Sequence, residues 1–107
     1  MHYPNPNYAC QAQTALAKPL FQEAEQYYFD ALRLAYKGDN DRANEYFMEA
    51  VERFQQVIDN WPDCEYAGRA QFLIGYCFEK LRKSGYLSEQ EANPIIEQAY
   101  KTVVEKY

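Results

Sequence analysis

The 107-residue chain has one histidine and three cysteines, so it is poor in the side chains that most often bind metals or act as catalytic bases. The histidine is His2, and no cysteine or histidine lies at zinc-site spacing from Cys10, Cys64 or Cys77. An odd cysteine count leaves room for one disulfide and one free thiol. Since nucleophile–base and metal-ligand patterns are missing, we predict no enzymatic activity, no metal and no cofactor.

Two of the cysteines have predictable surroundings. Cys77 falls on an apolar helical stripe, which indicates a small core residue. Cys64 follows Pro62 in the first turn of a helix, where the helix dipole can lower the pKa of a thiol. No histidine accompanies Cys64, and we do not expect a catalytic thiol there.

Long apolar runs and excess positive charge are also missing. No segment approaches the roughly 20 apolar residues of a membrane-spanning helix, and we predict no transmembrane segment. With 16 acidic and 11 basic residues the net charge is −5, so we predict no nucleic-acid partner. Residues 1–7 have neither the positive start nor the apolar stretch of a signal peptide, and the sequence alone leaves localisation open.

Aromatic and aliphatic side chains, in contrast, are abundant. Hydrophobic residues make up 48% of the chain and aromatic residues 17%, with eleven tyrosines and six phenylalanines. This composition is typical of a folded protein, and the length suits one domain. We expect some tyrosines to lie at binding surfaces, where the ring packs and the hydroxyl stays hydrated.

Apolar residues recur at three- and four-residue steps, which is the period of an α-helix. An N-terminal arm is predicted over residues 1–18, with an extended start and a short helix over residues 8–17 that ends at Lys18-Pro19. Residues 19–107 are predicted to form a domain of four helices without strands. The second of these has the strictest stripe: Ala43, Phe47, Ala50, Phe54, Val57 and Trp61.

Turn residues mark the predicted helix boundaries. Gly38-Asp39 provides a helix end and the cap of the next helix. Pro62 stops the second helix and Asp63 can cap the third. Ser88 begins a capping-box pattern that predicts a short turn, and Asn93-Pro94 is predicted to begin the last helix.

The second and fourth helices are similar in sequence. Phe54 and Tyr100 are 46 positions apart, and so are Trp61 and Tyr107. A fixed period with aromatic residues in phase indicates an internal repeat. Trp61-Pro62 is then a repeat boundary, where one helical hairpin ends and the next begins.

At these residues the chain resembles the tetratricopeptide repeat (TPR) family, whose unit is a helix-turn-helix of about 34 residues. The segment 37–43 is similar to the turn inside a repeat, and Ile74-Gly75 is similar to its Leu-Gly pair. Glycine in mid-helix costs about 1 kcal/mol relative to alanine, so Gly75 indicates a close approach of two helices.

The junction at residues 61–67 is similar to the bacterial envelope subgroup, which includes the Tol-Pal coordinator and the outer-membrane assembly lipoprotein. This resemblance covers residues 20–107. It implies antiparallel helical hairpins stacked as a short TPR-like solenoid that scaffolds other proteins without catalysis. It also implies a periplasmic or envelope-associated location, with the cytoplasm still open.

The resemblance further implies a concave groove along the first helix of each hairpin. The partner-binding residues predicted for this groove are Tyr28, Leu32, Arg69, Phe72, Tyr76 and Glu79. Phe72 and Tyr76 would anchor a peptide or helix of a partner protein. Alternatively, these rings pack beneath another part of the chain.

A second hypothesis is a structural subunit that assembles with itself. Stacked repeats generally need at least three units and capped ends, whereas this chain has about two. The terminal helices and the N-terminal arm would then stack on further copies, giving a homo-oligomer or filament. The apolar face expected to be available on the last helix consists of Ile95, Ile96, Ala99, Tyr100, Val103 and Val104.

Overall fold

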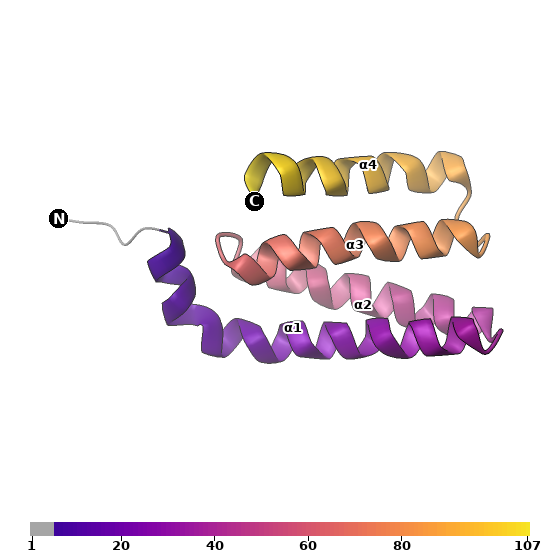
Figure 1. Cartoon of the computed structure of the whole chain (residues 1–107), viewed down its shortest axis with the longest axis horizontal. Helices are drawn as coiled ribbons and strands as arrows, with labels where there is room; N and C mark the ends of the chain where they lie inside the picture. Colours follow the sequence, from indigo (N-terminus) through magenta and orange to yellow (C-terminus); the bar gives the residue numbers. More distant parts are fainter. Residues whose placement is uncertain (1–5) are drawn as a thin grey trace.

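The computed structural model describes the chain from residue 6 onward, and its side chains from residue 15 onward. This part of the chain forms four α-helices and no strand, as the all-α prediction required. The helices are α1 (Pro6–Tyr36), α2 (Asn40–Asn60), α3 (Glu65–Lys83) and α4 (Glu89–Lys106). Short turns connect them, and consecutive helices run antiparallel (Figure 1). Within the described residues, none of the helices is long and apolar enough to cross a membrane.

The third helix connects the two halves of the molecule. α3 packs on α1 and α2 on one side and on α4 on the other, while α4 contacts neither α1 nor α2. Figure 1 accordingly shows α4 and α1 on opposite sides of α3, with α2 behind. The molecule is therefore a stack of two helical hairpins, α1–α2 and α3–α4.

The predicted stripe of α2 forms the centre of the core. Its first five members, from Ala43 to Val57, are at most 2% exposed, and Trp61 is half-buried at the helix end. From α1 the core receives Phe21. Phe21 is 1% exposed, and its ring centroid lies 5.5 Å from that of Phe54.

The helix boundary predicted at Lys18-Pro19 is wrong, because α1 runs through it without interruption. Proline removes one backbone donor and kinks a helix without necessarily ending it. Pro19 itself is exposed, whereas Ala17 and Phe21 on either side are buried and hold both parts of α1 in place. Figure 1 shows α1 bent towards its N-terminal end. Of the predicted arm, residues 1–5 lie outside the described residues, and residues 6 and 7 are helical.

Two predicted caps are confirmed. Gly38 has a φ of +83°, and the Asp39 side chain accepts a hydrogen bond from the backbone N–H of Arg42 at 3.4 Å. At the start of α4, Ser88 and Glu91 exchange the two hydrogen bonds of a capping box, each 3.1 Å long.

Two other boundaries differ from the prediction. α4 begins at Glu89 rather than at Asn93-Pro94, because the capping box starts a full helix instead of a short turn. Pro94 is exposed inside this helix. The N-cap of α3 is Cys64 rather than Asp63, and its side chain makes no capping hydrogen bond.

Candidate functional site: the groove between α1, α3 and α4

Two tyrosines of α4 lie over two glycines of α3. A Cβ atom built at Gly75 would be 2.6 Å from Cε1 of Tyr100, and one at Gly68 would be 3.0 Å from Cγ of Tyr107. The glycines are two helical turns apart, as are the tyrosines, so the two contacts share one register. The close helix approach predicted at Gly75 is therefore confirmed.

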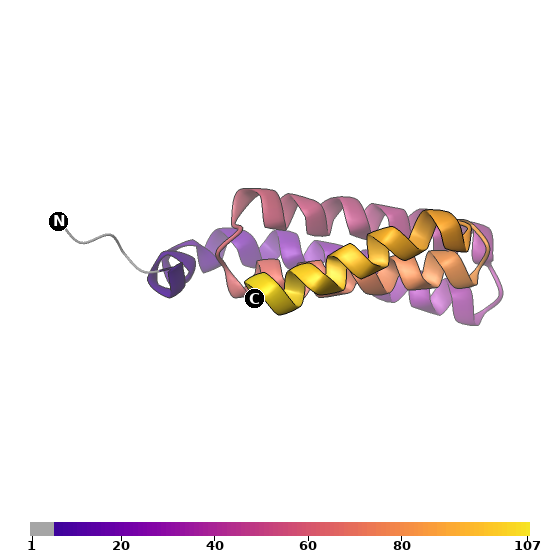
Figure 2. The same cartoon turned by 90° about the horizontal axis from the view of Figure 1, so that it is seen from above.

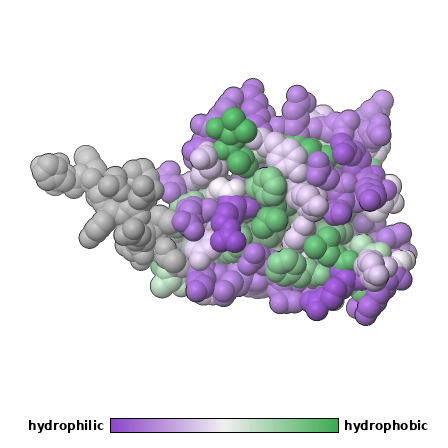
Figure 3. Space-filling model, viewed as in Figure 1, coloured by the Kyte–Doolittle hydropathy of each residue, from purple (hydrophilic) through white to green (hydrophobic). Residues whose placement is uncertain are grey.

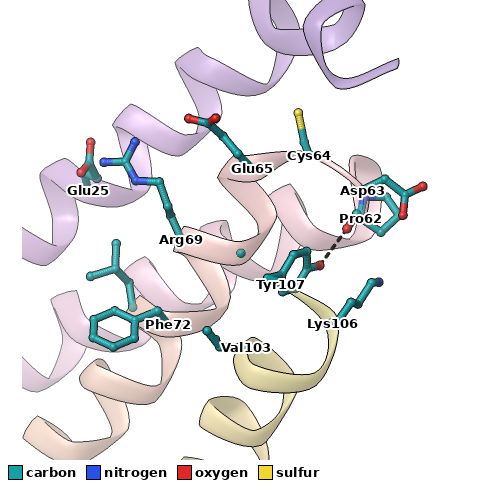
Figure 4. A pocket seen from close by; sticks show the side chains of 12 residues that line it. Glu25, Pro62, Asp63, Cys64, Glu65, Arg69, Phe72, Val103, Lys106 and Tyr107 are labelled. Carbon is teal, nitrogen blue, oxygen red and sulfur yellow. Dashed lines mark hydrogen bonds between the residues drawn. The ribbon is translucent and has the colours of Figure 1, made fainter. Parts of the chain in front are cut away.

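The C-terminal end of α4 is also tied to the turn between α2 and α3. The Tyr107 hydroxyl donates a hydrogen bond of 2.8 Å to the carbonyl oxygen of Pro62 (Figure 4). This contact places the end of α4 next to the N-terminus of α3. The two helix ends and α1 enclose a surface groove.

We call this groove the α1–α3 groove; it has a volume of 810 Å³. It lies between α1, the N-terminal half of α3 and the C-terminal end of α4. The lining residues that matter most are Glu25, Asp63, Arg69, Phe72, Val103 and Tyr107. Phe72 is 48% exposed and provides an apolar ring inside the groove.

Charged side chains surround this apolar ring. The Arg69 guanidinium extends towards α1, where its Cζ lies 5.0 Å from the ring centroid of Phe21 (Figure 4). Such a cation–π contact holds the guanidinium in place while leaving its donors available to hydrogen-bond. Glu25, Asp63 and Lys106 add charges of both signs along the groove. The groove thus combines an apolar anchor point with polar groups that can bind backbone or side-chain partners.

The predicted binding residues lie along one row but not in one cavity. Arg69 and Phe72 line the α1–α3 groove. Tyr76 and Glu79 line a smaller depression nearer the C-terminal end of α3, and Leu32 lines a third one beside the α1–α2 turn.

Ring contacts connect these positions. The ring centroids of Phe72 and Tyr76 are 6.5 Å apart, and those of Tyr76 and Tyr28 are 6.1 Å apart. Tyr28 is only 8% exposed and belongs to the core, where burial raises the pKa of its hydroxyl. Tyr28 therefore packs against Tyr76 from the core side and has almost no exposed surface for a partner to contact.

The sequence did not identify the tyrosines of α4 as part of the site. The ring centroids of Tyr100 and Phe72 are 5.6 Å apart. Burial, reinforced by the Glu79 side chain, raises the pKa of Tyr100 to about 12. The 46-residue period paired Tyr100 with Phe54 and Tyr107 with Trp61, but only the folded chain shows that Tyr107 lines the groove and that the Tyr100 ring lies beside Phe72.

The cysteines agree with the possibility of one bridge and one free thiol. Cys64 is 2% exposed and disulfide-bonded, so it has no thiol whose pKa the helix dipole could lower. Cys77 is a free, fully buried thiol, and burial raises its pKa to about 12. The side chain of Cys10 lies outside the described residues. In the part of the chain that the structure describes, no three His, Cys, Asp or Glu side chains cluster as metal ligands.

Comparison of the chain with protein-family models, curated proteins and solved structures finds no match. The function therefore has to be inferred from the surface of the molecule. In Figure 3, apolar patches on the face formed by α1, α3 and α4 are separated by hydrophilic side chains. The α1–α3 groove, where the Phe72 ring lies among charged side chains, has the apolar centre and polar rim that are common at protein-binding surfaces.

Proposed function

We propose that the protein is a non-catalytic, TPR-like interaction module that binds a peptide or helix of a partner protein in the α1–α3 groove. The observation that carries this proposal is the 48% exposed ring of Phe72 inside a groove bordered by Arg69 and Tyr107. Exposed aromatic rings and arginines are the residue types enriched at energetically important interface positions. A partner's apolar side chain would pack on Phe72, and its polar groups would meet the charged rim.

The arrangement of the hairpins supports the TPR-like part of the proposal. α3 packs against both helices of the first hairpin, and Gly75 permits its close contact with α4. Stacked hairpins of this kind present their first helices along a continuous concave surface. Phe72 and Tyr76 would lie on that surface.

We also propose an oxidising compartment, in line with the envelope resemblance. The disulfide at Cys64 supports this location, because disulfides persist mainly outside the cytosol. Titration of thiols in the denatured, unreduced protein from its own cells should find one reactive thiol, that of Cys77. Three reactive thiols would contradict the proposed compartment.

The groove proposal is tested by cross-linking from two matched positions. Phe72 and Phe29 are both 48% exposed, but only Phe72 lines the α1–α3 groove. Each is replaced in turn by photo-reactive benzoylphenylalanine, and the protein is irradiated in its own cells. We expect a discrete adduct from position 72 and none from position 29, with Phe72→Ala abolishing binding of the partner so identified. Equal labelling from both positions, or none from position 72, would refute the groove assignment.

The alternative of self-assembly has less support from α4 than its sequence suggested. Ile96 and Ala99 are at most 7% exposed because they pack on α3, and only Ile95, Val104 and Tyr107 stay substantially open. Apart from Val104, which is 84% exposed, the outward face of α4 carries polar, exposed residues: Gln90, Glu97, Lys101 and Glu105. In the cross-linking experiment, an adduct with the mass of two copies would favour self-assembly.

A further inference from the structure

A second groove lies on the opposite side of α3. α2 and α4 both pack on α3 without contacting each other, and their axes diverge in the view of Figure 2. This gap leaves a cleft of 500 Å³, which we call the α2–α4 groove. Its principal lining residues are Val51, Gln55, Gln71, Ile74, Phe78 and Ile95. Phe72 and Ile74 are separated by about 200° around the α3 axis, so the two grooves face opposite directions.

The α2–α4 groove is uncharged. None of the described residues that line it carries a charge, although 25% of the chain is charged. Its floor includes Ile74 at 4% exposure, and Ile95 is 41% exposed at its edge. Depletion of charge at the centre of a surface patch is typical of protein interfaces.

The spacing of the lining residues matches a helical occupant. Val51 and Gln55 on α2, and Gln71 and Phe78 on α3, recur one or two helical turns apart. The walls therefore run parallel to the helix axes over about 10 Å, which corresponds to two turns of an α-helix. An amphipathic helix can place its apolar face in such a groove, where its side chains one helical turn apart contact the groove walls.

The rim of this groove is acidic. Glu52 and Asp59 on α2 and Glu105 on α4 are exposed and lie three or four positions from lining residues. One exposed lysine, Lys101, lies at the same rim and pairs with Glu105, with its Nζ 4.0 Å from the Glu105 carboxylate. The net charge of −5 makes a second copy of this chain an unfavourable occupant and a basic partner a favourable one.

We propose that the α2–α4 groove binds an amphipathic α-helix of a partner protein, with an apolar stripe in the groove and lysines or arginines facing the acidic rim. This surface is separate from the α1–α3 groove and does not depend on the function proposed for it.

The test uses a fluorescent synthetic peptide with leucines at helical spacing and lysines on both flanks. Fluorescence anisotropy gives its Kd for the wild-type chain and for Gln98→Arg, which adds a positive charge to the groove wall at an exposed position. We expect binding to the wild type, weakened about tenfold by Gln98→Arg. Gln22→Arg adds the same charge on the exposed side of α1 and should change Kd by less than about twofold.

Three further measurements separate the alternatives. The same peptide with glutamates in place of its lysines should bind at least about tenfold more weakly, because the rim is acidic. Phe72→Ala should leave peptide binding unchanged, since Phe72 belongs to the other groove. The proposal is overturned if the lysine peptide does not bind or if Phe72→Ala, rather than Gln98→Arg, weakens it. It is also overturned if sedimentation shows a wild-type dimer that Gln98→Arg dissociates, because the occupant is then a second copy.

Discussion

The two hairpins use the same principle of large side chains against small ones, but distribute them differently. In the α1–α2 hairpin both helices contribute rings: Phe21 packs on Phe54, and Tyr28 on Phe47 with centroids 6.1 Å apart. Alanines, such as the fully buried Ala24, fill the spaces between them. In the α3–α4 hairpin the two tyrosine rings of α4 lie over glycines of α3, and α3 adds one ring, Phe72, whose centroid lies 5.6 Å from that of Tyr100.

The two helix interfaces differ in how much added side-chain volume they can accommodate. An alanine in the first hairpin already places a methyl group in the interface, whereas Gly75 leaves no room for one. The first hairpin also has a salt bridge between its helices, with Nε of Arg53 2.7 Å from Oε1 of Glu23. α4 has α3 as its single helical neighbour. We therefore expect the first hairpin to determine global stability and the second to respond locally.

The largest expected difference comes from the two aromatic residues that the repeat aligns, Phe54 and Tyr100. Phe54→Ala should lower the free energy of unfolding by about 3–5 kcal/mol, because Phe54 is fully buried in the α1–α2 core. Tyr100→Ala should cost about 2 kcal/mol, because Tyr100 is only half-buried and sits in the second hairpin. Denaturant unfolding measures both.

Native-state hydrogen exchange provides the regional readout for these variants. Tyr100→Ala should accelerate exchange in α4 and leave α2 nearly unchanged, because α4 opens from α3 alone. Phe54→Ala should accelerate exchange in all four helices. If Phe54→Ala does not fold, Phe54→Leu gives the same pattern with a smaller cost. Equal acceleration in α2 and α4 after Tyr100→Ala would contradict the proposed independence of the second hairpin.

A smaller effect, whose sign can reverse, is expected at Gly75. Alanine gains about 1 kcal/mol in a helix relative to glycine, but its Cβ overlaps the Tyr100 ring, and overpacking costs about 1–3 kcal/mol. Gly75→Ala should therefore destabilise the wild type by about 1 kcal/mol. In the Tyr100→Ala background the overlap is gone, and the same change should stabilise by about 1 kcal/mol.

Gly68 provides the control for this double-mutant cycle. Its Cβ would lie 3.0 Å from Tyr107, but Tyr107 is 41% exposed at the end of α4 and can move. Gly68→Ala should therefore be close to neutral in both backgrounds. Equal effects of Gly75→Ala with and without Tyr100 would show that the ring does not require the glycine.

The α2 stripe and the caps were predictable because they depend on neighbours within one or two helical turns. The prediction failed at Pro19 and Pro94, where local rules favour a helix boundary. Both prolines are exposed inside continuous helices, and the buried residues lie two positions away on either side: Ala17 and Phe21 around Pro19, and Ala92 and Ile96 around Pro94. Packing of Ala17 and Phe21 in the core, which the local pattern does not contain, kept α1 continuous, whereas the Ser88–Glu91 capping box started α4 before Pro94.

The candidate site was predictable only in its α3 portion. Arg69 and Phe72 share a helix face that the spacing reveals. The groove also needs Asp63 from the α2–α3 turn and Tyr107 from the end of α4. These residues meet because Tyr107 bonds to Pro62, 45 positions earlier, and no pattern along the chain specifies that contact.

The smallest expected effect concerns the start of the second hairpin, where Glu91 completes the capping box. Hydrogen bonds from Ser88 lower the pKa of Glu91, so its carboxylate adds stability above the ordinary carboxyl pKa of 4.5 and loses it as pH falls through the lowered value. Glu91→Gln should therefore lower the Tm near neutral pH, and the deficit should vanish in acid. Glu97→Gln removes an equally exposed charge from mid-helix, makes no cap and should show no such pH dependence. A Glu91→Gln deficit that persists unchanged in acid would mean that the carboxylate's charge does not contribute to the cap.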